Sequence, residues 1–148
     1  MTHHRSDALT ALWDAYSQST YLARTSRGEI RIHPGQSTPD LDALLSEAGA
    51  AQWAYLTACN PNSERLPPEE NGQRQNALRQ AVQDRGLTFF EGEGVLDAAV
   101  WPPEPSFLIL DISADDARSL GRQFGQLAIV VGRPGQVALL MSCDDAVH

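Results

Sequence analysis

Residues 106–141 of the sequence are SFLILDISADDARSLGRQFGQLAIVVGRPGQVALLM. The stretch opens with an almost unbroken apolar run over 106–112, which is typical of a buried strand. Ser113 then occupies the position of a helix N-cap, and Asp116 stands three residues later in place of the usual Glu of a capping box. The stretch therefore predicts a strand followed by a helix that ends at Gly125.

A hairpin is predicted after that helix. An earlier part of the chain is predicted to form a strand and then another helix. Apolar runs over 127–131 and 137–141 flank the segment 132–135, whose proline and glycine fit a type II turn. Residues 53–59 form a compact apolar strand, and alternation places successive side chains on opposite faces of it. A helix with a narrow apolar stripe follows over 67–85, so most of its surface is expected to face water.

The middle of the chain completes the predicted sheet. Residues 88–96 have strand character, and Gly92-Glu93-Gly94 within them predicts a β-bulge or a bend. The same segment is no phosphate loop, because no Lys-Ser/Thr follows and an acid stands in its middle. From residue 53 the order is strand, helix, strand, strand, helix, strand, strand. We therefore expect an α+β fold: a mainly antiparallel sheet with helices on one face, built on a ferredoxin-like split βαβ core.

Elements that precede this core are expected to extend or cover it. A first helix with Ser6 as N-cap is predicted to pack through an apolar stripe. The stripe consists of Leu9, Leu12, Trp13 and Tyr16. Residues 20–25 and 28–33 form a predicted hairpin. A second helix opens with Thr38 and Pro39 and carries an apolar stripe until Gly49 ends it.

The composition bounds the class of protein. The chain has 148 residues, of which 42% are hydrophobic and 20% charged, and this fits one soluble domain over residues 1–148. The net charge of −8 argues against non-specific binding to nucleic acid or to an anionic membrane surface, although a local pocket could still hold a small anion. No apolar run reaches membrane-spanning length, and the N-terminus lacks a secretory signal, so we expect a cytoplasmic protein.

Cysteine and histidine give little sign of a metal or redox centre. Cys59 and Cys143 are too few for a disulfide framework, and reduced thiols are expected, with their pairing left open. The four histidines show no ligand spacing, so the sequence predicts no metal site and no cofactor. Sequence alone leaves the oligomeric state and any protein partner undetermined.

Two asparagines and a glutamine are candidates for a binding site. Asn60 falls at the carboxyl end of the strand 53–59, where sheets often place ligands, but Asn60-Pro61-Asn62 is also good turn chemistry. Asn71 lies in the first turn of the helix over 67–85, as a ligand-orienting residue or simply a capping one. Gln126 follows a helix and precedes a strand, and its amide would serve a ligand or nearby backbone equally well.

Glu104 is the candidate for acid–base chemistry. It lies between prolines in Trp101-Pro102-Pro103-Glu104-Pro105-Ser106, which predicts a stiff arm that holds the carboxyl in place. A preorganised carboxylate suits general acid–base catalysis. The competing interpretation is a surface acid at the start of a strand.

These segments together resemble a known family. They are residues 55–61, the pair 70–71, residues 101–106 and residues 124–128. In this order they resemble the uncharacterised bacterial family catalogued as domain of unknown function 3293, over most of the chain. Carried over by motif, the resemblance points to Thr57, Asn60, Pro61, Asn71, Trp101, Glu104, Ser106 and Gln126. Cys59 stands where the family usually has an aromatic residue, which weakens the idea of a cysteine nucleophile.

Three functional hypotheses follow. The first is a domain that binds a small ligand, such as a nucleotide-like compound or a metabolite. In it, Thr57 and the polar candidate residues converge beside Trp101 and Tyr55. The second is a hydrolase or transferase with Glu104 as general acid or base. The third is a protein-interaction module that uses a sheet face or the edge hairpin at 137–141.

Overall fold

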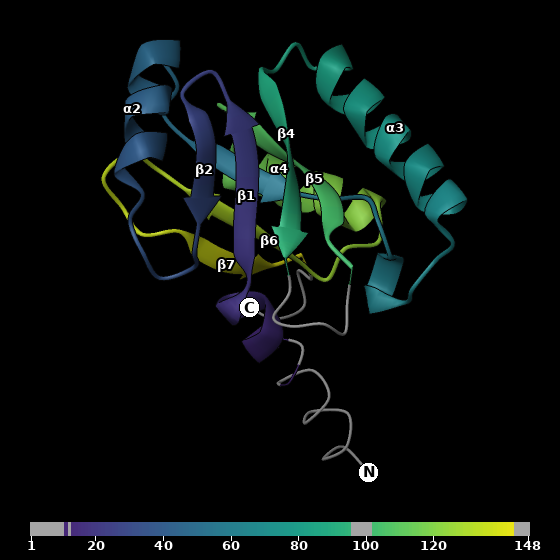
Figure 1. The fold of residues 1–148 in the computed structure, drawn as a ribbon. Coiled ribbons are helices and arrows are strands. Elements are labelled where there is room, and N and C mark those ends of the chain that lie inside the picture. Colours follow the sequence, from purple (N-terminus) through teal and green to yellow (C-terminus); the bar gives the residue numbers. More distant parts are fainter. Residues whose placement is uncertain (1–10, 12, 96–101, 144–148) are drawn as a thin grey trace.

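The computed structural model describes residues 11, 13–95 and 102–143 and has an α+β fold (Figure 1). The strands are β1 (Thr20–Thr25), β2 (Gly28–Ile32), β3 (Trp53–Leu56), β4 (Phe89–Val95), β5 (Glu104–Leu110), β6 (Ala128–Gly132) and β7 (Leu139–Ser142). The helices are α2 (Pro39–Ala48), the short 3-10 helix η1 (Pro61–Ser63), α3 (Pro68–Asp84) and α4 (Ala114–Gln123). Helical residues 13–18 precede β1.

The seven strands form one antiparallel sheet in the order β2-β1-β4-β5-β3-β6-β7. Strands β3 and β4, which α3 connects, are separated by β5. The sheet curls so that the segments next to its two edge strands, β2 and β7, meet. There Gly35 N donates to Ala138 O at 2.7 Å, and Ala138 N donates to Gln36 O at 3.0 Å. The predicted antiparallel α+β class is confirmed, while the ferredoxin-like detail stays a prediction.

One face of the sheet is covered by α3 and α4. Ala54, Leu56 and Ala58 point to this face and pack with Leu78 and Val82 of α3. Ser113 caps α4 as predicted, since its Oγ accepts a hydrogen bond from Asp116 N at 3.1 Å. Burial of each methylene group in such a core stabilises the fold by about 0.8 kcal/mol, which anchors both helices to the strands.

The opposite face lies inside the curl and is closed at one end by α2 (Figure 1). Trp53 and Tyr55 of β3 point to this side, so the predicted alternation holds through Leu56. Helix α2 runs from the predicted Pro39 to the predicted stop at Gly49, whose φ of 67° is left-handed. The far end of the curl, away from α2, is where polar side chains gather.

Several details differ from the sequence predictions. Strand β3 ends at Leu56 instead of Cys59, because Thr57 Oγ1 turns to Pro105 O at 2.6 Å and accepts from Cys59 N at 3.0 Å. The turn after β6 has Pro134 second and Gly135, with φ 77°, third, as predicted, but it spans residues 133–136, with Gln136 N donating to Arg133 O. In the first helix Trp13 is 39% exposed, so the predicted packing fails at this position. Ser6, Leu9 and Leu12 lie outside the described residues.

The predicted bulge in β4 is also wrong. The pairing with β1 and β5 runs residue by residue through Gly92 and Gly94 without an inserted residue. Glycine is required at 92 for another reason: a Cβ there would lie 1.8 Å from the backbone oxygen of Leu22. The close approach of two strands therefore accounts for Gly92.

The sheet edges and helices bear on two further predictions. Among the described strands β7 pairs only with β6, and Leu139 on it is 54% exposed, yet no partner is identified, so the interaction-module hypothesis stays a prediction. Within the described residues, no helix is both long and apolar enough to cross a membrane.

Candidate functional site

Asn60 is the centre of a polar network at the end of β3. Its backbone is left-handed (φ 49°, ψ 62°), a conformation that asparagine tolerates better than most residues. Its Oδ1 accepts from Leu66 N at 2.9 Å and from Asn71 Nδ2 at 2.8 Å, and its own N donates to Asn71 Oδ1 at 2.9 Å. The two asparagines therefore bind each other reciprocally and fix the chain between β3 and α3.

The segment after α4 holds this turn from the other side. Arg74 Nε donates to Ala58 O at 2.7 Å, and its Nη2 donates to Phe124 O. Asn62 N donates to Gly125 O at 2.8 Å. Gln126 Nε2 donates to Cys59 O at 3.0 Å, so Gln126 supports the turn that carries Asn60.

Glu104 completes the network from the first position of β5. Pairing with Gly94 of β4 positions it, and Asn60 Nδ2 donates to its Oε2 at 2.8 Å. Burial raises the pKa of the Glu104 carboxyl, and the hydrogen bond from Asn60 opposes this by a smaller amount. The strand pairing and the hydrogen bond from Asn60 thus hold Glu104 in place.

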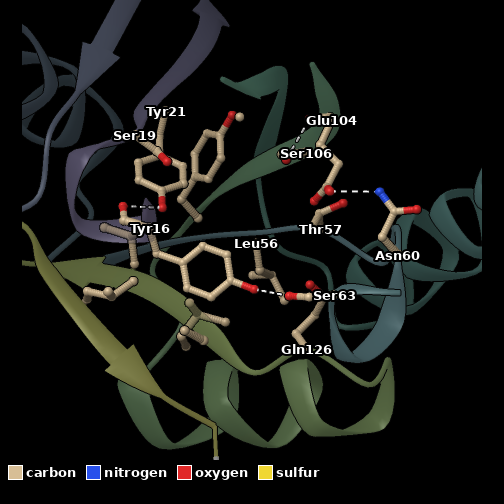
Figure 2. Close-up of a pocket in the computed structure, with 16 residues that line it drawn as sticks. Tyr16, Ser19, Tyr21, Leu56, Thr57, Asn60, Ser63, Glu104, Ser106 and Gln126 are labelled. Carbon is tan, nitrogen blue, oxygen red and sulfur yellow. Dashed lines mark hydrogen bonds between the residues drawn. The ribbon is translucent and has the colours of Figure 1, made fainter. Parts of the chain in front are cut away.

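A cavity of about 60 Å³ lies beside this carboxyl at the open end of the curl (Figure 2). Polar walls come from Thr57, Asn60, Ser63, Ser106 and Gln126, and the chain's first helical segment contributes Tyr16. No Arg, Lys or His is among the described residues that line it. Glu104 therefore faces a confined space without a basic side chain to neutralise it.

Three tyrosines form the other wall of the cavity. The hydroxyl of Tyr16 is hydrogen-bonded to Ser63 Oγ, as Figure 2 shows, while Tyr21 donates to Tyr16 O and Tyr55 donates to Leu22 O, both at 2.7 Å. The rings of Tyr21 and Tyr55 meet edge to face at 5.3 Å. Burial raises the pKa of all three phenols, so they remain neutral. These rings therefore offer a rigid aromatic surface opposite a carboxyl group.

A larger hollow of about 500 Å³ shares Asn60 and Glu104 with the cavity and extends along α3. Pro68 and the prolines before β5 give it apolar walls, and Arg65 and Arg79 line it as well. Its volume falls within the range of small-molecule sites, roughly 300–1,000 Å³. The Asn60–Glu104 pair thus belongs to two adjoining spaces.

Gln75 of α3 is the buried polar residue of this hollow. The side chain is 6% exposed, and its Oε1 accepts from Ala58 N at 3.0 Å. Its Nε2 has no hydrogen-bond partner in the described part of the chain. An unpaired buried amide costs about 1–3 kcal/mol, which makes this nitrogen an exception among buried polar groups.

The structure gathers most of the residues that the sequence singled out. Thr57, Asn60, Glu104, Ser106 and Gln126 line the small cavity. Asn71 lines the larger hollow instead and reaches the network through Asn60. Some of these side chains also bind nearby backbone groups: Ser106 Oγ donates to Glu104 O at 2.9 Å. The turn interpretation of Asn60 holds as well, since its Oδ1 accepts from Leu66 N. Trp101 lies outside the described residues.

Gln75, Tyr16 and Ser63 were missed by the sequence analysis. Gln75 had a detectable signal, because it lies three residues before Leu78 and seven before Val82 and so shares the face of α3 that packs on the sheet. Tyr16 was predicted only as a packing residue. Ser63 has no signal in the sequence, because its place follows from the left-handed turn that contains it.

Neither cysteine has the environment of a reactive thiol. Both are free and buried, and burial raises the pKa of Cys59 and brings that of Cys143 to about 11. A raised pKa leaves less thiolate at neutral pH. Among the described residues, no group of three or more His, Cys, Asp or Glu side chains could hold a metal ion.

Comparison with known proteins adds a family. The family model described as Protein of unknown function (DUF3293) matches residues 56–129, half of the chain. The chain belongs to the DUF3293 family. The DUF3293 match includes Asn60, Gln75 and Glu104, whereas Tyr16 precedes it. No curated protein and no solved structure matches the chain. The resemblance drawn from the motifs is confirmed, and the family supplies no activity.

Proposed function

We propose that this DUF3293 protein binds a small polar ligand through a cationic amino group that Glu104 holds. The observation that carries the proposal is a half-buried carboxyl that faces a cavity lined by no basic side chain among the described residues. A partly desolvated carboxylate is unfavourable unless it is paired. An ammonium group on a ligand would supply the missing charge.

The walls of the cavity favour the same group. Tyr16, Tyr21 and Tyr55 present aromatic surface, and an aromatic face attracts a cation by about 0.5–2 kcal/mol. Hydroxyl and amide oxygens of Thr57 and Gln126 can accept further hydrogen bonds. A phosphate would be repelled by Glu104 and would find no basic side chain among the described residues that line this cavity. The ligand's amino end is therefore expected here, with its bulk in the larger hollow.

A thermal-shift series with matched small molecules tests the proposal. Ethylammonium and ethanol differ in charge but little in size, and only the first is expected to raise the melting temperature. Glu104→Gln keeps an oxygen for Asn60 and removes the charge, so it is expected to abolish the shift. Glu64→Gln is the control, because Glu64 is exposed on the adjacent loop. Equal stabilisation of the Glu104→Gln variant would contradict the proposal.

The pH dependence follows from the same carboxyl. Ammonium binding requires the ionised form of Glu104, so affinity is expected to be full above the pKa of Glu104 and to fall as the pH drops through it. Burial raises that pKa, and the loss therefore begins at a higher pH than for an ordinary glutamate. Affinity that does not change across this range would indicate that another group binds the amine.

General acid–base catalysis is a second candidate, which the raised pKa of Glu104 and its hydrogen bond to Asn60 favour. Its first test needs no substrate: the ¹³Cδ resonance of Glu104 is followed against pH by NMR. A pKa at the ordinary value for glutamate would remove the support for a hydrolase or transferase.

A further inference from the structure

The proposed function leaves one polar group of the site unused, the amide nitrogen of Gln75. The Gln75 side chain is more than nine-tenths buried, and Oε1 is committed to Ala58 N at 3.0 Å, with Thr57 Oγ1 a further 3.4 Å neighbour. This fixes the orientation of the amide, since a flip would place two donors against each other. The nitrogen is therefore held as an N–H donor without a partner among the described residues. Its chemical complement is an acceptor oxygen.

The charges around the larger hollow specify which kind of acceptor. Arg65 and Arg79 line the hollow, and its only acidic side chain among the described residues is Glu104, on the side shared with the small cavity. Arg79 follows Gln75 by one helical turn, so both lie on the same face of α3. Its guanidinium stacks 5.0 Å from the centre of the Phe107 ring and contacts the exposed Glu91 at 3.2 Å. Among the described residues, the lining of this hollow thus carries two basic side chains against one acidic side chain, in a chain whose net charge is −8.

We propose that the larger hollow is a carboxylate subsite, in which Gln75 Nε2 donates to a carboxylate oxygen and Arg79 supplies positive charge. The inference rests on the proposed function, because it places the ligand's amino group at Glu104. The ligand class is then a small zwitterion, an amine and a carboxylate joined by a spacer. A hydrogen bond to an ionised carboxylate is stronger than one between neutral groups. Donation from Gln75 and Arg79 would therefore favour a carboxylate over a neutral acceptor.

NMR titration of the whole chain with defined compounds tests the subsite. The protein labelled with ¹³C and ¹⁵N is titrated with acetate, with ethylammonium, and with glycine, 4-aminobutanoate and 6-aminohexanoate. Acetate is expected to shift the Gln75 side-chain NH₂ resonances, and ethylammonium the Glu104 carboxyl. One zwitterion, with the spacer that spans both groups, is expected to shift both and to bind about tenfold more tightly than either half.

Variants of α3 connect the binding to Gln75. Gln75→Glu keeps an oxygen for Ala58 N and replaces the NH₂ donor, so acetate and the zwitterion are expected to bind about tenfold more weakly while ethylammonium is unaffected. Gln73→Glu adds the same charge at an exposed position of the same helix and is expected to change nothing. Arg79→Gln leaves Gln75 in place and is expected to weaken the binding of the carboxylate ligands but not that of ethylammonium. This variant provides the test if Gln75→Glu does not fold.

The outcomes separate this inference from the proposal on which it rests. If ethylammonium shifts Glu104 but no carboxylate shifts Gln75, the subsite is refuted and the amine site stands. If neither group responds, both fail. Carboxylate binding that survives in Gln75→Glu, or in Arg79→Gln when the first variant is unfolded, also refutes the subsite.

Discussion

Replacement of Asn60 by alanine tests whether the network around this residue holds the site together. The variant loses three side-chain hydrogen bonds: to Glu104 at 2.8 Å, from Leu66 N at 2.9 Å and from Asn71 Nδ2 at 2.8 Å. It also places alanine in a left-handed backbone conformation, since φ at this position is 49°. Both changes act against the folded state.

The size of the effect follows from these two contributions. Three hydrogen bonds at about 1 kcal/mol each lower the free energy of unfolding by roughly 3 kcal/mol. The left-handed backbone adds about 1 kcal/mol. A total of roughly 4 kcal/mol is a large part of the 5–15 kcal/mol that stabilises a typical domain. With an m value of about 2 kcal/mol/M, the urea midpoint is expected to fall by about 2 M.

Asn62→Ala is the matched control for this measurement. Asn62 is also left-handed (φ 55°), but its side chain is exposed and makes no hydrogen bond within the described residues. Urea unfolding followed by circular dichroism is expected to show a loss of about 1 kcal/mol for this control, from the backbone alone. If Asn60→Ala costs no more than Asn62→Ala, the network does not stabilise the turn and the reasoning is refuted.

Three further substitutions test other parts of the structure. Glu104→Gln is expected to stabilise the protein at neutral pH: the folded pKa is raised, so the native state binds more protons, and wild-type stability falls as the pH rises through that pKa. Unfolding at pH 4 and pH 8 should show an advantage for the variant only at pH 8; a constant difference contradicts this. Gly92→Ala is expected to lower the free energy of unfolding by at least about 3 kcal/mol, because its Cβ would lie 1.8 Å from Leu22 O. A small change in melting temperature would instead show that the two strands can move apart. A Cβ added at Gly72 of α3 would meet no atom of another described segment within 4 Å, so Gly72→Ala should instead stabilise the protein by about 0.5–1 kcal/mol and raise the urea midpoint; a decrease contradicts the open surroundings.

Local signals predicted the helices and hairpins well. Pro39 and Gly49 bound α2, and Ser113 caps α4, because capping depends on a few neighbouring backbone groups that short sequence patterns specify. Alternation in β3 correctly assigned side chains to the two faces of the sheet through Leu56. Local chemistry did not predict where β3 ends, since that is decided by Pro105, which lies 48 residues away from Thr57.

The candidate site was predicted in its members but not in its arrangement. Turn and proline motifs singled out Asn60 and Glu104 without showing that they hydrogen-bond each other. Gln75 was overlooked because it is a polar residue on a mostly polar helix, although its spacing from Leu78 and Val82 places it on the face that packs on the sheet. The bulge predicted from two glycines in β4 was wrong for a related reason: the constraint on Gly92 comes from the neighbouring strand.

The sequence by itself determined the order of strands and helices, the faces that they bury and the polar residues available to a site. These depend on spacing, caps and hydrophobic periodicity, which act over a few residues. Only the tertiary structure decided that the sheet curls, that Glu104 meets Asn60 beside a small cavity, and that one nitrogen of Gln75 has no partner among the described residues. Such features arise from contacts between segments far apart in the chain, whose geometry depends on the packing of the whole sheet.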